Sequence, residues 1–157
     1  VIAPGSSIVQ NPHVQIPAKV CIDPAAKSLT FRIVRRDSQF RGKVRITGVV
    51  KNIGNKAFQS RSGQASIVLE EKPQGGRARI VKQKALTNLA VGQSITVYWE
   101  RDWYSSSPNE GEFPPEYIIR LSYDPDIYAD ANKNNDDCKT NNNMIKKSGM
   151  EINALFR

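Results

Sequence analysis

Oxygen-bearing side chains alternate in one stretch near the end of the sequence, with the spacing of a cation-binding loop. The four residues are Asp130, Asn132, Asn134 and Asp136. Ca²⁺ binds about six to eight oxygen atoms, and calcium loops supply the first of them from alternate positions. The pattern predicts a Ca²⁺ site in the loop of residues 124–137. The alternative is an Asn- and Asp-rich hairpin stabilised by hydrogen bonds from side chains to the backbone.

Three aromatic residues, Trp103, Tyr104 and Phe113, are candidates for binding a ligand. They lie close together in the sequence at and after the end of a predicted strand, and exposed aromatic rings stack on sugars or peptides. Trp103 lies on the same face of the predicted strand as Trp99, which we expect in the core. Packing in the interior is therefore the alternative for these rings.

The sequence holds two cysteines, Cys21 and Cys138, one near each end. In an exported protein an even number of cysteines favours a disulfide, which here would tie an N-terminal arm to the acidic loop. Cys138 lies in a polar loop where a thiol has no core to fill. This placement favours the bridge over two free thiols.

Residue types suited to catalysis are scarce. The single histidine, His13, lies in a proline-rich segment with no framework to hold it against a nucleophile. Zinc sites need several Cys or His ligands, and the chain offers three, widely separated. A glycosidase would need a carboxylate pair, and the nearest candidates are Glu110, Glu112 and Glu116 in a Pro-rich connection. We therefore predict that the protein is not an enzyme and that Ca²⁺ is its only candidate cofactor.

The net charge of +8 is unevenly distributed. Residues 27–51 hold eight basic side chains against one carboxylate, whereas residues 100–137 hold ten of the fifteen carboxylates. This asymmetry predicts orientation towards an anionic surface or polymer, or self-association, with solvated strand faces as the alternative. Few aromatic residues interleave the basic ones, so nucleic acid is not an expected partner. No apolar run reaches the roughly 18 residues that a transmembrane segment needs.

Apolar and polar residues alternate along successive segments, as they do in half-buried β-strands. The predicted strands are 28–35, 43–52, 64–72, 78–86, 93–104, 116–124 and 148–156. The fourth is the most polar, and we expect it at a sheet edge. No segment shows a helical period over three turns.

The pattern predicts an all-β fold, an immunoglobulin- or fibronectin III-like antiparallel β-sandwich of about seven strands. Four prolines in residues 1–26 favour an extended segment before it. We therefore expect a Pro-rich N-terminal arm at 1–27 and a single sandwich domain at 28–157.

Three motifs resemble those of the bacterial cell-adhesion-related domains called CARDB. They are VRITGVVKNIGN at 44–55, the run from Leu89 to Val97, and an Asp/Asn-rich hairpin marked by Asp124, Asp126, Asn141 and Asn142. The resemblance covers roughly residues 29–156. It implies an immunoglobulin-like domain of an exported or surface protein, with an interaction or spacer role and no catalysis.

These patterns together predict a secreted, periplasmic or cell-surface interaction or structural module. Its partner would be a protein or a surface glycan. The alternative function is a carbohydrate- or cell-wall-binding module that uses the aromatic residues, with Ca²⁺ in the acidic loop.

Overall fold

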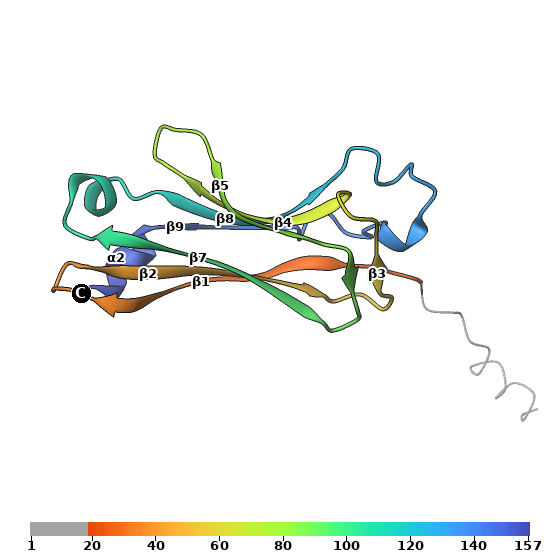
Figure 1. The fold of residues 1–157 in the computed structure, drawn as a ribbon, viewed down its shortest axis with the longest axis horizontal. Helices are drawn as coiled ribbons and strands as arrows, with labels where there is room; N and C mark the ends of the chain where they lie inside the picture. The colour runs from red at the N-terminus through yellow and green to blue at the C-terminus, as the bar shows by residue number, and fades with distance from the viewer. Residues whose placement is uncertain (1–18) are drawn as a thin grey trace, which may run out of the picture.

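The computed structural model describes residues 19–157, which form two antiparallel β-sheets packed face to face (Figure 1). One sheet contains, in spatial order, β1 (Pro24–Arg36), β2 (Arg41–Asn52) and β7 (Ser94–Tyr104). The other contains β5 (Arg79–Ala85), β4 (Ala65–Lys72), β8 (Glu116–Tyr123) and β9 (Met144–Ser148). A short separate pair is made by β3 (Phe58–Gln59) and β6 (Asn88–Leu89). Helical turns form η2 (Pro108–Glu112), η3 (Lys133–Asn135) and α2 (Met150–Leu155).

The alternating pattern of the central strands produces the core between the two sheets. Along β2 every second residue is buried from Gly42 to Asn52, and along β8 Tyr117, Ile119 and Leu121 are buried. A pleated strand directs successive side chains to opposite faces, so these rows meet between the layers. The all-β sandwich that the sequence predicts is confirmed.

Gly48 lies in the inward row of β2, facing Ile119 of the other sheet. A Cβ atom on Gly48 would lie 2.5 Å from Cδ1 of Ile119 on β8. The missing side chain therefore makes room for Ile119, which is fully buried.

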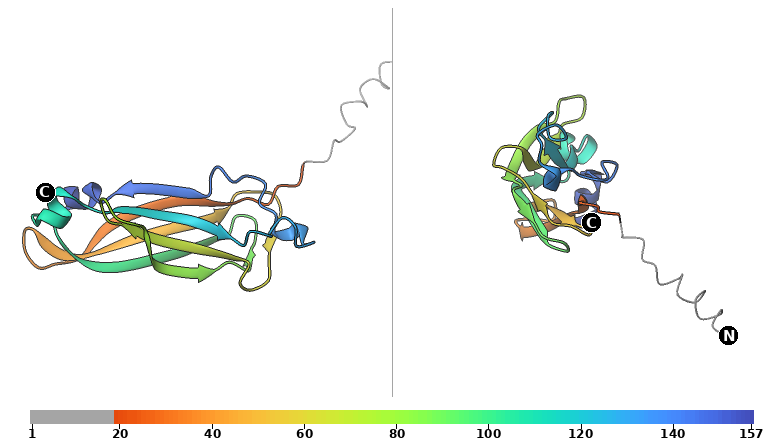
Figure 2. Two further views of the ribbon diagram at one scale, coloured as in Figure 1. Left: turned by 90° about the horizontal axis from the view of Figure 1, so that it is seen from above. Right: turned by 90° about the vertical axis from the view of Figure 1, so that its right-hand side faces the viewer.

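The sandwich is elongated, and its two ends differ (Figure 2). We call the end formed by β3, β6 and residues 124–143 the loop end, and the end formed by η2 and α2 the helix end. Cys21 and Cys138 form a disulfide at the loop end, with their Cα atoms 5.3 Å apart. The predicted bridge between the start of the chain and the acidic loop is confirmed.

The prediction of a strand at 148–156 is wrong. The last strand is β9, and residues 150–155 form helix α2 instead. The alternation is misleading because Ile152 and Phe156, one helical turn apart, are the buried residues that contact the core. Strand β9 was not predicted, because its side chains are partly buried or exposed and none belongs fully to the core.

The polar strand predicted at a sheet edge is confirmed, since β5 pairs only with β4. Strand β1 begins at Pro24, four residues before the predicted start, while residues 1–18 of the predicted arm lie outside the described residues. No helix within residues 19–157 has the length and apolar character needed to cross a membrane.

Candidate functional site

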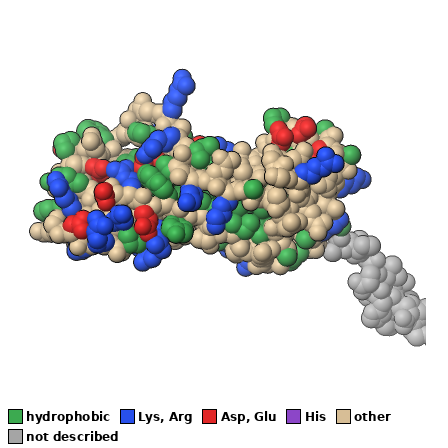
Figure 3. Space-filling view, viewed as in Figure 1, with side chains coloured by type: hydrophobic (Ala, Val, Ile, Leu, Met, Phe, Trp, Pro, Cys, Tyr) green, Lys and Arg blue, Asp and Glu red, His purple; other side chains and the backbone are tan. Residues whose placement is uncertain are grey.

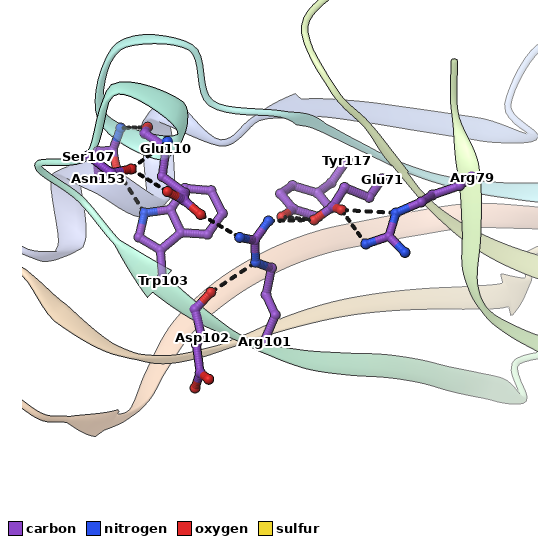
Figure 4. A network of polar contacts seen from close by, with 9 residues as sticks. All are labelled: Glu71, Arg79, Arg101, Asp102, Trp103, Ser107, Glu110, Tyr117 and Asn153. Atoms are coloured by element: carbon purple, nitrogen blue, oxygen red, sulfur yellow. Dashed lines mark hydrogen bonds and ion pairs between the residues drawn. The ribbon is translucent and has the colours of Figure 1, made fainter. Parts of the chain in front are cut away.

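An arginine in the inward row of β7 organises the polar groups near the helix end. Arg101 follows Val97 and Trp99 in the alternation of β7, so its side chain points between the sheets. Its guanidinium contacts Glu71 Oε2 of β4 at 2.8 Å and Glu110 Oε1 of η2 at 2.5 Å. Figure 4 shows Arg101 lying between the two carboxylates. One arginine therefore joins three separate elements.

Glu71 is the most buried carboxylate of this network, with its side chain 5% exposed. It accepts hydrogen bonds from the Tyr117 hydroxyl at 2.7 Å and from Arg79 Nη2 at 2.7 Å, in addition to Arg101. Burial opposes ionisation, but the hydrogen bonds from Tyr117, Arg79 and Arg101 outweigh it and hold the pKa of Glu71 below its usual value. Glu71 is therefore a fixed anion at neutral pH.

Glu110 is held from its other side by its own helical turn. Ser107, which precedes η2, donates its hydroxyl to Glu110 Oε2 and accepts the backbone N–H of Glu110. Asn153 of α2 donates to the Glu110 carbonyl at 2.7 Å and accepts from Trp103 Nε1 at 2.8 Å. The helix end is thus cross-linked by hydrogen bonds from β7 through α2 to η2.

Two shallow hollows lie on either side of the Arg101–Glu110 pair. The first, of about 460 Å³, is lined by Glu71, Arg101, Glu110 and Phe113 together with Pro73, Gln74, Asn109 and Pro115. The second, of about 410 Å³, includes Tyr104 and the charged residues Arg35, Asp37, Arg41 and Asp102. Side chains of both charges gather over this end of the molecule (Figure 3). The surface offers hydrogen-bonding groups beside single exposed rings.

The three aromatic residues predicted to bind a ligand have different positions. Trp103 is 2% exposed and packs in the core against Tyr117, which agrees with the alternative of packing in the interior, although it also borders the second hollow. Phe113 is 58% exposed at the first hollow, and Tyr104 is 37% exposed at the second, beneath the Arg41 guanidinium. Tyr104 and Phe113 have exposed rings, and ligand contact by the three residues stays a prediction.

The four residues predicted to bind Ca²⁺ lie together in the loop at the other end. Asp130 Oδ1 accepts the backbone N–H of Asn132 at 2.9 Å, and Asn132 Oδ1 accepts that of Asn134 at 2.9 Å. These are the side-chain-to-backbone bonds of the alternative hairpin. Asp136 Oδ1 is buried without a hydrogen-bond partner. Burial and the charge of Asp130 raise the pKa of Asp136. Ca²⁺ binding by these four residues stays a prediction.

The network around Arg101 was not among the predicted site residues. One signal was available, because Arg101 interrupts the apolar inward row of the strand predicted at 93–104. A charged residue at such a position requires a partner in the interior. The partner could not be inferred, since Glu71 belongs to a strand in the other sheet.

Comparisons with known proteins identify no family. No family model and no curated protein matches the sequence. Among solved structures, a putative β-galactosidase from Bacteroides fragilis is similar at a TM-score of 0.43 and 11% identity, over 75% of this chain and 15% of that one. A β-glucuronidase 2 of Bacteroides uniformis gives 0.39 and 14%, over 76% and 12%. A β-glucosidase from Kluyveromyces marxianus gives 0.29 and 14%, over 77% and 14%.

The chain therefore spans less than a sixth of the length of each of these enzymes. Similarities of this strength define neither a common ancestor nor an activity. The CARDB resemblance likewise stays a prediction.

Proposed function

We propose that this chain is a non-catalytic interaction or structural module of an exported or cell-surface protein. The observation that carries the proposal is the use of the ionisable groups at the helix end. Glu71 and Glu110 are bound to the same guanidinium, and Glu71 is held ionised by three donors. A general acid needs the opposite, a carboxyl group whose pKa is raised towards neutrality.

The disulfide supports the exported location. Cys21 and Cys138 are bridged, and disulfides persist mainly in oxidising compartments outside the cytoplasm. The described residues contain no unpaired cysteine. A thiol titration of the protein taken from its own compartment tests this part, since two free thiols would contradict export.

A carbohydrate- or cell-wall-binding role is the second candidate, and the two exposed rings at the helix end favour it. Phe113 and Tyr104 each stand beside charged groups that can donate to or accept from sugar hydroxyls. Carbohydrate sites combine an aromatic platform with such polar groups. In this arrangement Glu71, Arg101 and Glu110 would orient the sugar, and the rings would stack on it.

A binding panel separates the two candidates. Neutral polysaccharides, acidic polysaccharides and peptidoglycan fragments are tested by calorimetry against the wild type, Phe113→Ala and Tyr104→Ala. Tyr98→Ala is the matched control, because the exposure of Tyr98, 47%, lies between those of Tyr104 and Phe113, and Tyr98 lines neither hollow. Binding that is lost in Phe113→Ala and Tyr104→Ala but kept in Tyr98→Ala supports the carbohydrate candidate. If wild type binds nothing in the panel, the interaction or structural module is favoured. Release of reducing sugar from any substrate by wild type would overturn the non-catalytic proposal.

A further inference from the structure

Two buried aspartates meet at the loop end, beside the disulfide. Asp23 is 3% exposed and Asp137 is 5% exposed. Ile22 pairs with Asp137 in a parallel bridge, and the Cys138 N–H donates to the Ile22 carbonyl at 2.8 Å. A carboxylate oxygen of Asp23 lies within 4.8 Å of both sulfur atoms. The fold therefore buries two acidic groups from distant parts of the sequence in one place.

Neither aspartate has a basic partner within residues 19–157. The ion pairs of this part of the chain involve other carboxylates. Asp23 accepts the side-chain amide of Asn142 at 3.0 and 3.3 Å, and Asp137 accepts the Tyr123 hydroxyl at 2.7 Å and the Lys139 N–H at 3.0 Å. A buried carboxylate is costly unless it is paired with a cation, protonated or bound to a metal.

Buried oxygen atoms without hydrogen-bond partners lie on residues near these two aspartates. Four buried side-chain atoms within residues 19–157 have no hydrogen-bond partner, all oxygens of one loop: those of Asn135, Asp136, Asn142 and Asn143. The Asn142 amide donates to Asp23 at 3.0 Å, and the Asn143 amide lies close enough to Asp137 to favour the ionised form of its carboxyl group. Rotating such an amide by half a turn exchanges its nitrogen and oxygen, because the two atoms occupy nearly equivalent positions. The unpartnered oxygen would then face the carboxylate.

The backbone holds these two asparagines in place. The Asn142 carbonyl accepts the N–H of Ala26 in β1 at 2.9 Å, and the Asn143 carbonyl accepts the N–H of Leu121 in β8 at 2.9 Å. The backbone of Asn142 and Asn143 is thus bound to a strand of each sheet. An amide rotation needs no change in the backbone.

We propose that Asp23, Asp137, Asn142 and Asn143 bind a hard divalent cation, with Ca²⁺ the best match. Two carboxylates and two amide oxygens supply up to about six oxygen ligands, the lower end of the Ca²⁺ range. The cation would neutralise the two carboxylates and give the unpartnered amide oxygens a partner. The site shares no residue with the alternating positions 130, 132, 134 and 136.

The electrostatics of Asp137 agree with this geometry. Burial, partly offset by the Tyr123 hydroxyl, raises its pKa, and the charge of Asp23 adds to the rise. A divalent cation would reverse that effect, since it favours the ionised form. The competing occupant is a proton on one carboxyl, which the experiment separates from a cation.

Terbium luminescence provides the test, because Tb³⁺ replaces Ca²⁺ and is excited by a nearby tyrosine. Tyr123 lies 2.7 Å from Asp137, so Tb³⁺ in this site should show tyrosine-sensitised emission that Ca²⁺ competes away. CaCl₂ should also raise the Tm of the wild-type protein by several degrees relative to chelator. Asp23→Asn and Asp137→Asn should each weaken Tb³⁺ and Ca²⁺ binding at least about tenfold.

Control variants distinguish this site from the alternating residues at positions 130 and 136. Asp130→Asn and Asp136→Asn should leave binding unchanged, whereas a loss in these variants with retention in Asp23→Asn would overturn the proposal. Asn143→Ala serves as a further variant if an aspartate substitution prevents folding, and should weaken binding as well. If the wild-type protein shows neither sensitised emission nor a Ca²⁺-dependent Tm, the proposal is overturned. If its Tm in that case responds only to pH, the site holds a proton instead of a cation.

Discussion

Arg101 and Glu71 connect the two sheets through the interior of the sandwich. Arg101 Nη1 lies 2.8 Å from Glu71 Oε2, although β7 and β4 belong to different layers. Their side chains are 24% and 5% exposed. The pair lies where the apolar core gives way to the polar hollows of the helix end.

Replacing Arg101 should destabilise the protein strongly. Arg101→Met keeps much of the side chain's length but leaves Glu71 and Glu110 without their shared cation. Breaking a buried ion pair by removing one partner costs about 3–5 kcal/mol, which urea denaturation would measure. Arg35→Met is the control, since Arg35 pairs with Asp37 on the surface and its loss should change stability little. Equal effects of the two substitutions would contradict the assigned role of Arg101.

Glu71 should make the stability of the protein depend on pH in the acid range. Its folded-state pKa is lowered from 4.5, so its contribution is fully present above that value and is lost as the pH falls through the folded pKa. The free energy of unfolding of wild type should therefore fall more steeply below about pH 4.5 than that of Glu71→Gln. Denaturation curves at a series of pH values would show this, and parallel pH profiles would rule out the effect.

Opening the disulfide should lower stability without changing the fold. The bridge closes a loop with a sequence separation of 117. The chain-entropy estimate for a loop of this length is about 4–5 kcal/mol. Thermal unfolding of wild type with reductant should match that of a Cys21→Ala/Cys138→Ala double variant without it. An unchanged Tm in both would show that the loop end is held by its hydrogen bonds alone.

Trp103 should matter for stability and not for ligand contact. Trp103→Phe removes the donor to Asn153 Oδ1 and leaves a buried acceptor unsatisfied, which costs about 1–3 kcal/mol, and the smaller ring adds a cavity. Asn153→Ala should be similarly destabilising, because it removes the same bond from the other side. Affinity for any glycan should stay unchanged in folded Trp103→Phe, and a selective loss of binding would contradict the burial argument.

Gly48 and Ile119 should behave as a coupled pair. Gly48→Ala places a methyl group against Ile119 Cδ1 and should cost about 1–3 kcal/mol through overpacking. Adding Ile119→Val removes that atom and should recover part of the loss. A double-mutant cycle measures the coupling. Strictly additive effects would mean that the contact is relieved elsewhere.

The fold was predictable because its long strands carry a strict alternation. Leu29, Ile46, Ile67, Val97 and Ile119 stand in such rows, and all are buried. The errors lie where packing overrides the local pattern. Residues 148–156 alternate as a strand would, yet a helix covers the end of the core there. Strands β3 and β6, which pair with each other, are two residues long, too short to show an alternating pattern.

The site was less predictable, because its contacts are made across the sheets. The disulfide could be inferred from residue type alone, since Cys138 has only polar neighbours in sequence. In contrast, Asp23 and Asp137 are 114 positions apart and are brought together only by the packing of the loop end. The environment of Trp103 depends likewise on α2, whose Asn153 accepts the hydrogen bond of its ring. Such facts require the three-dimensional arrangement.

The disulfide also has a mechanical consequence. In Figure 1 the C-terminus lies at the helix end, and the disulfide between Cys21 and Cys138 lies at the loop end. A pulling force applied between Lys19 and Arg157 would pass through the sulfur–sulfur bond directly to Cys138, so the backbone from β1 to β8 would bear no tension. Only the residues after Cys138, which include β9 and α2, could be drawn out. Nineteen residues (157 − 138) span about 65 Å at most when fully extended, so any lengthening under force would be limited to the unravelling of the last strand and helix.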